Sequence, residues 1–349
     1  MTNYYPLKSQ HGLALISVLL IFAIVAVLAG AMIERQSLDI QRSGNLQALQ
    51  QARAYSTGIE YAVRSGLQLD FKDNKEVDHL LEEWAKEHTY PLQPGTAKIQ
   101  IFDAQARFNL NGLHKTASDR SVQVQRFKNL LNELGLEESI ADRTQKFMDE
   151  DSQVDNDYLA NEVPYRASYN LFKHPSELLL VQGVDPDAYR KLTPYISTLP
   201  VGAALNINTA SNKVMAALST SWSLADADAA IGNRGETGFA TVDDFWGLTE
   251  VQPFTGASGD LPDSSDDKNS QEVWEKADFS VNSQYFEVFA KVTLADRMAT
   301  IEMLIYRNAE TGIMRTYYRD YSRTEARIPS ANSANNNNST GNSADNSTQ

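Results

Sequence analysis

The sequence predicts an α+β protein in which one long N-terminal helix packs on a small antiparallel sheet, with a large and mostly helical domain inserted into it. Three observations support this prediction. An apolar run near the N-terminus continues without a stop signal into an amphipathic helical pattern. Three runs rich in β-branched and aromatic residues lie near the C-terminus, with turn signals between them. Helical patterns fill most of residues 114–276, between the first strand and those runs.

Composition limits the classes of function that the chain can have. Its 349 residues could hold about two domains. The net charge of -14 argues against a phosphate-binding surface, because proteins that bind DNA or RNA usually present a basic face. The chain contains no cysteine, which excludes disulfides, thiolate catalysis and cysteine-ligated zinc.

The apolar run spans residues 13–33 and is interrupted only by Ser17. About 21 residues in a helix cover roughly 30 Å, which is the thickness of a bilayer's hydrocarbon core. A secretory signal peptide has a shorter apolar core of about 7 to 15 residues. Two alternatives stay open here, namely signal-peptide cleavage near the small residues 28–31 and a plain single-span anchor. Lys8 and the terminal amine favour a cytoplasmic N-terminus.

The helical pattern continues beyond the apolar run. Residues 34–69 contain no proline, and apolar side chains recur at spacings of three and four: Leu46, Leu49, Ala52, Tyr55, Ile59, Ala62, Val63 and Leu67. We therefore expect one helix of roughly 55 residues, about 80 Å long, whose first half lies in lipid and whose second half lies on a soluble domain. Close contact with other membrane helices would use small side chains at Ala23, Ala26, Ala29 and Gly30.

The rest of the chain divides into a body, an insert and a tail. The body comprises residues 34–113, with a strand at Ala97–Phe102, and residues 277–327, with strands at about 279–294, 297–307 and 312–321. In the insert, residues 114–276, we expect helices over 121–134, 138–151, 174–182, 186–195, 212–219, 224–234 and 241–248, with Thr209 or Ser211 as one N-cap. Residues 328–349 are rich in Ser and Asn and are predicted to be disordered.

The N-terminus resembles that of a type IV prepilin-like protein: a short polar leader ends in Gly12, and an apolar helix starts immediately after it. The resemblance implies that residues 1–12 are a leader, that a prepilin peptidase cuts between Gly12 and Leu13, and that Leu13 is then N-methylated. Most members carry a glutamate at the fifth position after the cut, where this chain has Ser17. A carboxylate in lipid needs a partner, which in those members is the neighbouring subunit's terminal amine.

A longer, ordered set of motifs resembles the K-type minor pseudopilin of bacterial type II secretion systems. The set comprises the leader, Ser17, "RFNLNGL" (107–113), "SELLLVQGVDPDAYRKLTPYISTLP" (176–200), "LNINTAS" (205–211) and "VNSQYFEVFAKVTLADR" (281–297). The resemblance implies a pilin-like body in the periplasm, a single-pass anchor in the inner membrane, and contact with the inner-membrane secretion platform. It also implies a complex with the I-type and J-type minor pseudopilins at the tip of the pseudopilus. Ser17 fits the tip, because a tip subunit has no subunit above it.

Two acidic stretches are candidates for a calcium site, because calcium takes six to eight oxygen ligands and calcium is known among these pseudopilins. One holds Asp149, Asp151, Asp155, Asp157 and Glu162. The other holds Asp260, Asp263, Asp266, Asp267 and Glu272. For each, the alternative is an acidic loop that is only solvated. No cofactor is required by either interpretation.

Residues 206–245 resemble a helix-hairpin-helix module of the kind that holds DNA backbones, but the glycine hairpin is replaced by the acidic, glycine-free "STSWSLADADA" (219–229). A membrane-anchored DNA-binding protein of a competence or type IV pilus system is therefore the alternative function, and an adaptor without a filament role is a third. The five histidines have no metal-ligand spacing, and the sequence has no nucleophile elbow or phosphate loop. We expect a structural protein and no enzyme.

Overall fold

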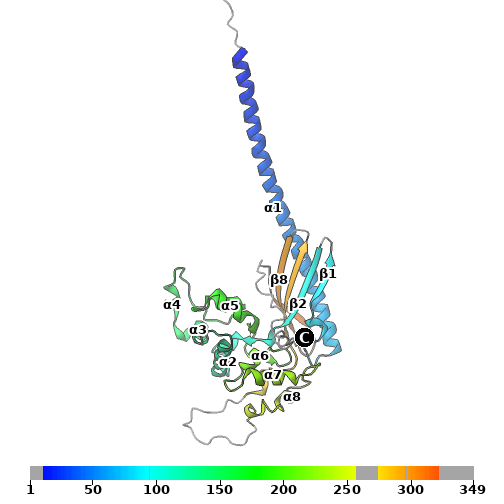
Figure 1. Cartoon of the computed structure of the whole chain (residues 1–349), viewed down its shortest axis with the longest axis vertical. Coiled ribbons are helices and arrows are strands. Elements are labelled where there is room, and N and C mark those ends of the chain that lie inside the picture. The colour runs from blue at the N-terminus through cyan, green and yellow to red at the C-terminus, as the bar shows by residue number, and fades with distance from the viewer. Residues whose placement is uncertain (1–10, 94, 257–273, 295–296, 322–349) are drawn as a thin grey trace, which may run out of the picture. The chain divides into compact units, whose positions relative to one another are not determined.

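The computed structural model describes residues 11–93, 95–256, 274–294 and 297–321 (Figure 1). The tail 328–349 and the whole second acidic stretch lie outside the described residues. The chain divides into two compact units, Met1–Thr57 and Gly58–Gln349, and each is described by itself.

Helix α1 (His11–Asp73) is continuous over 63 residues, somewhat longer than the predicted 55. In the second unit, Ile59, Val63, Leu67 and Phe71 recur every four residues and are all buried. This spacing keeps the four side chains on one face of the helix, which packs on the sheet. In the first unit, Leu46 and Leu49 of the predicted stripe are exposed.

The sheet has five strands in the order β1-β2-β7-β8-β9, and every neighbouring pair is antiparallel. The strands are β1 (His88–Leu92), β2 (Gly95–Asp103), β7 (Tyr285–Leu294), β8 (Arg297–Arg307) and β9 (Met314–Asp320). The predicted strand at Ala97–Phe102 and the predicted C-terminal meander are thus confirmed. The sequence analysis missed β1, an edge strand whose Pro91 has no amide hydrogen and argues locally against a strand.

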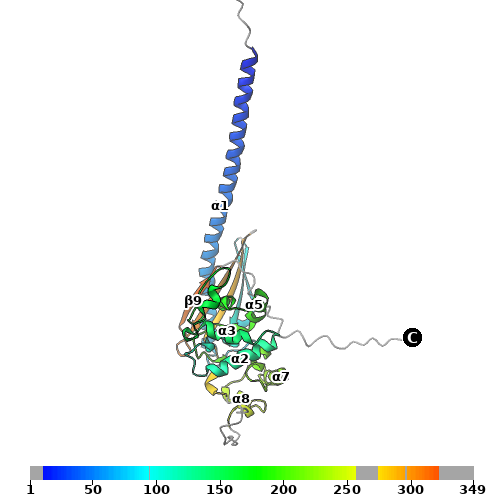
Figure 2. The same cartoon turned by 90° about the vertical axis from the view of Figure 1, so that its left-hand side faces the viewer.

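The insert leaves and re-enters the sheet at one end. Strands β2 and β7 are neighbours although about 180 residues separate them, and Asp103 at the end of β2 lies opposite Phe286 near the start of β7. The chain between these residues therefore forms a domain attached where β2 ends and β7 begins. Figure 2 shows the helices of this domain in front of the sheet and below it.

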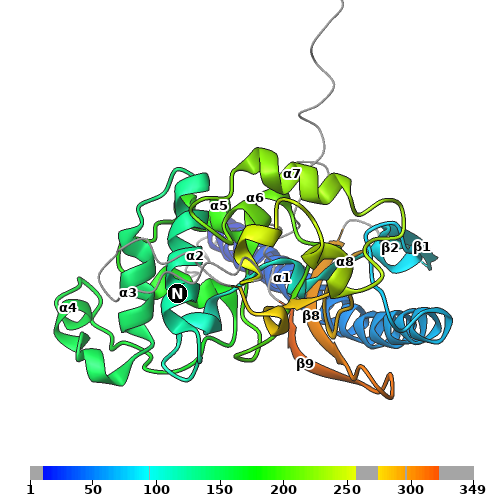
Figure 3. The same ribbon diagram turned by 90° about the horizontal axis from the view of Figure 1, so that it is seen from below.

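The insert contains two hydrophobic cores among the described residues. The first extends from Phe108 to Ile196, with Ala217 added. It includes side chains of α2 (Arg120–Glu133), α3 (Ser139–Phe147), α4 (Asp155–Leu159) and α5 (Pro186–Leu192). The second joins Ile207 to Val281, with α6 (Asn212–Ala216), α7 (Leu224–Gly232) and α8 (Val242–Trp246). Figure 3 shows the two groups of helices side by side. Two short parallel pairs, β3 (Phe108–Asn109) with β4 (Ile196–Ser197) and β5 (Leu205–Asn206) with β6 (Phe279–Ser280), complete the insert's connections.

Two predicted helices of the insert differ from the structure. The helix expected over 138–151 ends at Phe147, because the Asp149 side chain accepts a hydrogen bond from the Asp151 amide and starts a separate 3-10 turn. The segment expected as a helix after His174 is a 3-10 helix, Pro175–Leu180, closed by a capping box between His174 and Glu177. Ser211, not Thr209, caps α6.

Candidate functional site

The apolar segment of α1 is fully helical and its described side chains are exposed. From Leu15 to Ile33, the large apolar side chains are 51–74% exposed. Among the described residues, α1 is the one helix long and apolar enough to cross a membrane. Ser17, Ala23, Ala26, Ala29 and Gly30 are also exposed, and a Cβ built on Gly30 would meet nothing within 4 Å. This surface is available to lipid or to another helix.

The first acidic stretch does not gather its carboxylates. Asp149 accepts a hydrogen bond from Arg120 at 2.8 Å, and Lys115 bonds Asp151 at 3.1 Å. Asp155 accepts from the Ala167 amide at 3.1 Å, while Asp157 and Glu162 are exposed. Burial alone would raise the pKa of Asp149, but the hydrogen bond and charge of Arg120 outweigh burial and lower it. Asp149, Asp151 and Asp155 thus have partners within the chain, and calcium binding at this stretch stays a prediction.

The second acidic stretch cannot be placed in the same way. Asp260, Asp263, Asp266, Asp267 and Glu272 all lie outside the described residues.

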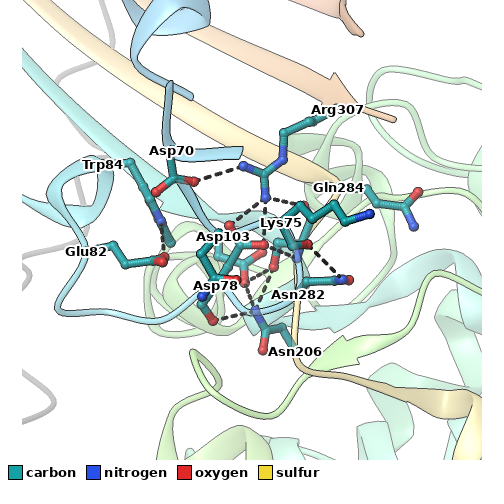
Figure 4. A network of polar contacts seen from close by, with 12 residues as sticks. Asp70, Lys75, Asp78, Glu82, Trp84, Asp103, Asn206, Asn282, Gln284 and Arg307 are labelled. Carbon is teal, nitrogen blue, oxygen red and sulfur yellow. Dashed lines mark hydrogen bonds and ion pairs between the residues drawn. The ribbon is translucent and has the colours of Figure 1, made fainter. Parts of the chain in front are cut away.

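A buried polar network joins the body to the insert instead (Figure 4). At its centre is Arg307, the last residue of β8, which is 2% exposed. Its Nη2 donates to both oxygens of Asp78, at 2.5 and 2.6 Å, and its Nη1 donates to Asp70 at 3.0 Å. The guanidinium also lies over the ring of Phe286, 4.6 Å from its centroid. One cation therefore connects the end of α1, the loop after it and the sheet.

Asp103, the last residue of β2, is the second centre of this network. It accepts hydrogen bonds from the Gln105 amide at 2.8 Å, Asn206 Nδ2 at 3.0 Å, and the hydroxyls of Thr209 and Ser283, both at 2.5 Å. Asn206 and Thr209 are buried directly beside Ile207 and Ala210 of the insert's second core. The carboxylate thus holds the insert at the point where the chain leaves the sheet.

Carboxylates outnumber cations in this network. Asp70, Asp78 and Glu82 bring carboxylate oxygens within 4.8 Å of one another, the one such group of three found among the described residues. Burial raises the pKa of Asp70 to about 6, and the neighbouring charges of Glu82 and Asp78 add to the shift. Burial likewise raises the pKa of Asp103 to about 6 and raises the pKa of Asp78 and of Glu82.

The helix-hairpin-helix-like segment lacks a surface for phosphate. Arg234 donates to the carbonyl of Ala210 at 2.7 Å, and burial lowers its pKa to about 10. Lys213 lies over the ring of Tyr195, 5.6 Å from its centroid. Both basic side chains of the segment therefore serve its own packing, and no observation supports the DNA-binding alternative.

The sequence analysis missed the residues of the buried network. Arg307 and Asp78 are separated by 229 residues, so no local pattern connects them. The sequence did contain one signal: Arg307 ends one predicted apolar strand, and Asp103 directly follows another. Charged residues at such positions need a partner, because they are rarely buried without one.

Comparisons with known proteins agree on one family. Residues 106–201 match a model for the first domain of "Type II secretion system (T2SS), protein K", and residues 205–261 match a second model with the same description. The chain is 34% identical over 346 residues to type II secretion system protein K of Pseudomonas aeruginosa, covering 93% of this chain and 96% of that protein. It is 31% identical over 310 residues to the protein K of Pectobacterium carotovorum, covering 82% and 89%.

One solved structure has a similar fold. A chain of the GspK-GspI-GspJ complex from the type 2 secretion system of enterotoxigenic Escherichia coli is 29% identical, with a TM-score of 0.67. The match covers 81% of this chain and all of that chain.

Proposed function

Because this chain belongs to the protein K family of the type II secretion system, we propose that it is the minor pseudopilin at the tip of the pseudopilus, where it initiates assembly for protein export across the outer membrane. The observation that carries this proposal is the similarity to a protein K over 93% of the chain. A structural component of this kind turns over no substrate.

Processing by a prepilin peptidase is the first step that the proposal requires. The peptidase would cut between Gly12 and Leu13 at the cytoplasmic face of the inner membrane and leave Leu13 N-methylated. The polar leader that ends in Gly12 and the apolar run that follows it at once support this site. The apolar helix then remains in the membrane, with its N-terminus cytoplasmic and the body in the periplasm.

A position at the tip explains why residue 17 is a serine and not a glutamate. A glutamate at this depth in lipid is stable only when a cation neutralises it. The subunit at the tip has no subunit above it to supply an amine. A neutral serine removes the need for one.

The I-type and J-type minor pseudopilins are the proposed partners, supported by the similarity to a chain of the GspK-GspI-GspJ complex. The inner-membrane platform would then extend the filament below them. Co-expression of this full chain, affinity-tagged, with I-type and J-type subunits should give one complex that elutes together in detergent. Recovery of the tagged chain alone, while the I and J subunits elute together without it, would contradict the proposal.

Calcium binding stays a prediction for both acidic stretches. We propose the second as the site, because Asp149 and Asp151 of the first lie beside Arg120 and Lys115. Calorimetric titration of residues 36–327 with calcium should release heat that disappears when Asp263, Asp266 and Asp267 become Asn. The matched control changes Asp149 and Asp155 to Asn and should keep the heat. Absence of heat at millimolar calcium removes the prediction.

A further inference from the structure

The charges of the Arg307 network do not balance. Four carboxyl groups lie in the network with one buried guanidinium (Figure 4): Asp78 and Asp103 are buried, and Asp70 and Glu82 are partly buried. The other ionisable groups beside it cannot compensate. Burial lowers the pKa of His79, which favours its neutral form, and Lys75 directs its ammonium to Glu76 at 3.5 Å. If all four carboxyls were ionised, the site would bury a large excess of negative charge, which is costly at low dielectric.

The excess charge lies where the body meets the insert, so it can affect the contact between them. The network contains the end of α1 through Asp70, the end of β2 through Asp103 and the end of β8 through Arg307. From the insert it contains Asn206, which donates to Asp103, to the carbonyl of Asp78 at 3.3 Å and to the hydroxyl of Ser283 at 2.8 Å. A change of charge here acts directly on the contact between body and insert.

We propose that the Arg307 network makes the contact between the sheet and the inserted domain sensitive to pH. The contact becomes more stable when carboxyls of the network take up protons and less stable when they lose them. The proposal concerns packing within this chain and does not depend on the proposed function.

The direction of the effect follows from linkage. The pKa of Asp70 and that of Asp103 are raised to about 6 in the folded chain, from the ordinary value of 3.8. Between about pH 4 and pH 6 the folded state therefore binds protons that the unfolded state does not, and folding becomes more favourable as the pH falls. Each such carboxyl changes the unfolding equilibrium constant by up to about tenfold per pH unit in this window.

The test compares charge-neutralising variants of the full chain in detergent micelles. Asp70→Asn keeps the acceptor for Arg307 and removes one negative charge. Glu82→Gln also removes one negative charge. It keeps an acceptor for the amide of His79 and the indole of Trp84, which both donate to one oxygen of Glu82. Asp73→Asn, at the exposed end of the same helix, is the matched control.

The first readout is urea unfolding of each protein at pH 4.5 and pH 7.5. The ratio of the wild-type unfolding constant to that of Asp70→Asn should fall by roughly ten- to thirtyfold on acidification, and for Asp73→Asn it should stay nearly constant. Glu82→Gln should change in the same direction as Asp70→Asn. A purely structural role predicts the same loss of stability at both pH values.

The second readout is amide hydrogen exchange over residues 206–210, corrected for the intrinsic effect of pH. Protection in the wild type should be greater at pH 4.5 than at pH 7.5, and this difference should shrink in Asp70→Asn and Glu82→Gln. Ratios of unfolding constants that do not vary with pH, or an equal change in Asp73→Asn, would overturn the proposal.

Discussion

Arg307 donates to two aspartates and to the carbonyl of Ser283 while being almost completely buried. Its replacement by Met would leave the buried Asp78 and the partly buried Asp70 without their cation. Removing one partner of a buried ion pair typically costs about 3–5 kcal/mol. We expect a loss of this size in urea unfolding at pH 7.5, against less than about 0.5 kcal/mol for Arg315→Met on the exposed strand β9. A loss below 1 kcal/mol for Arg307→Met would contradict this account of the network.

The contribution of Glu60 to stability should depend on pH in the direction opposite to that of the Arg307 network. The hydrogen bonds from Arg319, both at 2.7 Å, and from Thr316 lower the pKa of Glu60 below its ordinary value of 4.5. Its contribution is therefore present above pH 4.5 and is lost as the pH falls through the lowered folded-state pKa. Since Arg319 is partly exposed, we expect Glu60→Gln to cost about 1 kcal/mol at pH 7 and much less at pH 3.

Thermal unfolding at both pH values measures this effect. Glu76→Gln, whose side chain is 73% exposed, serves as the control and should change little at either pH. An equal loss for Glu60→Gln at pH 3 and pH 7 would show that its charge is not what stabilises the contact.

At the scale of single residues, sequence reasoning succeeded where the signal is local. The buried positions Ile59, Val63 and Leu67 follow from their spacing. For the cap of α6 the sequence left Thr209 and Ser211 open, and the structure has Ser211. The partners of Asp103 could not be predicted in this way. Thr209 and Ser283 lie 106 and 180 residues away and meet it only after the sheet has formed.

At the scale of elements, length decided what was predictable. Helix α1 and the strands β7, β8 and β9 have long, regular patterns, and their existence was predicted. Short elements depend on side-chain caps and on pairing with distant segments. The aspartate that ends α3 and the pairing of β1 with β2 are of this kind.

Residue 17 of the apolar helix provides a test of whether another subunit lies above this one. If nothing lies above this subunit, Ser17→Glu places a carboxylate in lipid without a neutralising amine, at a cost of up to about 3 kcal/mol. The yield of the complex with the I-type and J-type subunits should fall, while Ser17→Ala should leave it unchanged. The measurement is the amount of complex recovered by affinity purification. An increased yield for Ser17→Glu would argue that another subunit's amine reaches this site.

At the scale of the whole molecule, the insert has more internal structure than the sequence analysis assigned to it. One block, residues 114–276, was expected, whereas the described residues form two cores. The two family models cover 106–201 and 205–261 and follow the same division. Periodicity identifies helices but does not say which of them share a core, because that depends on contacts made across the chain.

The net charge of -14 makes a prediction about nucleic acid. A chain with this net charge is expected to release few counterions on binding, so its binding to DNA should be weak even at low salt. An electrophoretic shift assay of the full chain in detergent at low salt should show no retention of duplex DNA. Salt-sensitive retention that is lost in Lys213→Ala would revive the helix-hairpin-helix interpretation.

The central claim is that the N-terminal helix is that of a processed pseudopilin, and the mass of the mature protein tests it most directly. The full chain is co-expressed with a prepilin peptidase, and the intact mass is measured beside that of Gly12→Ala. The wild type should lose residues 1–12 and gain one methyl group, while Gly12→Ala should keep the leader. A mature wild-type protein that retains Met1, or one cut after the small residues 28–31, would contradict the claim.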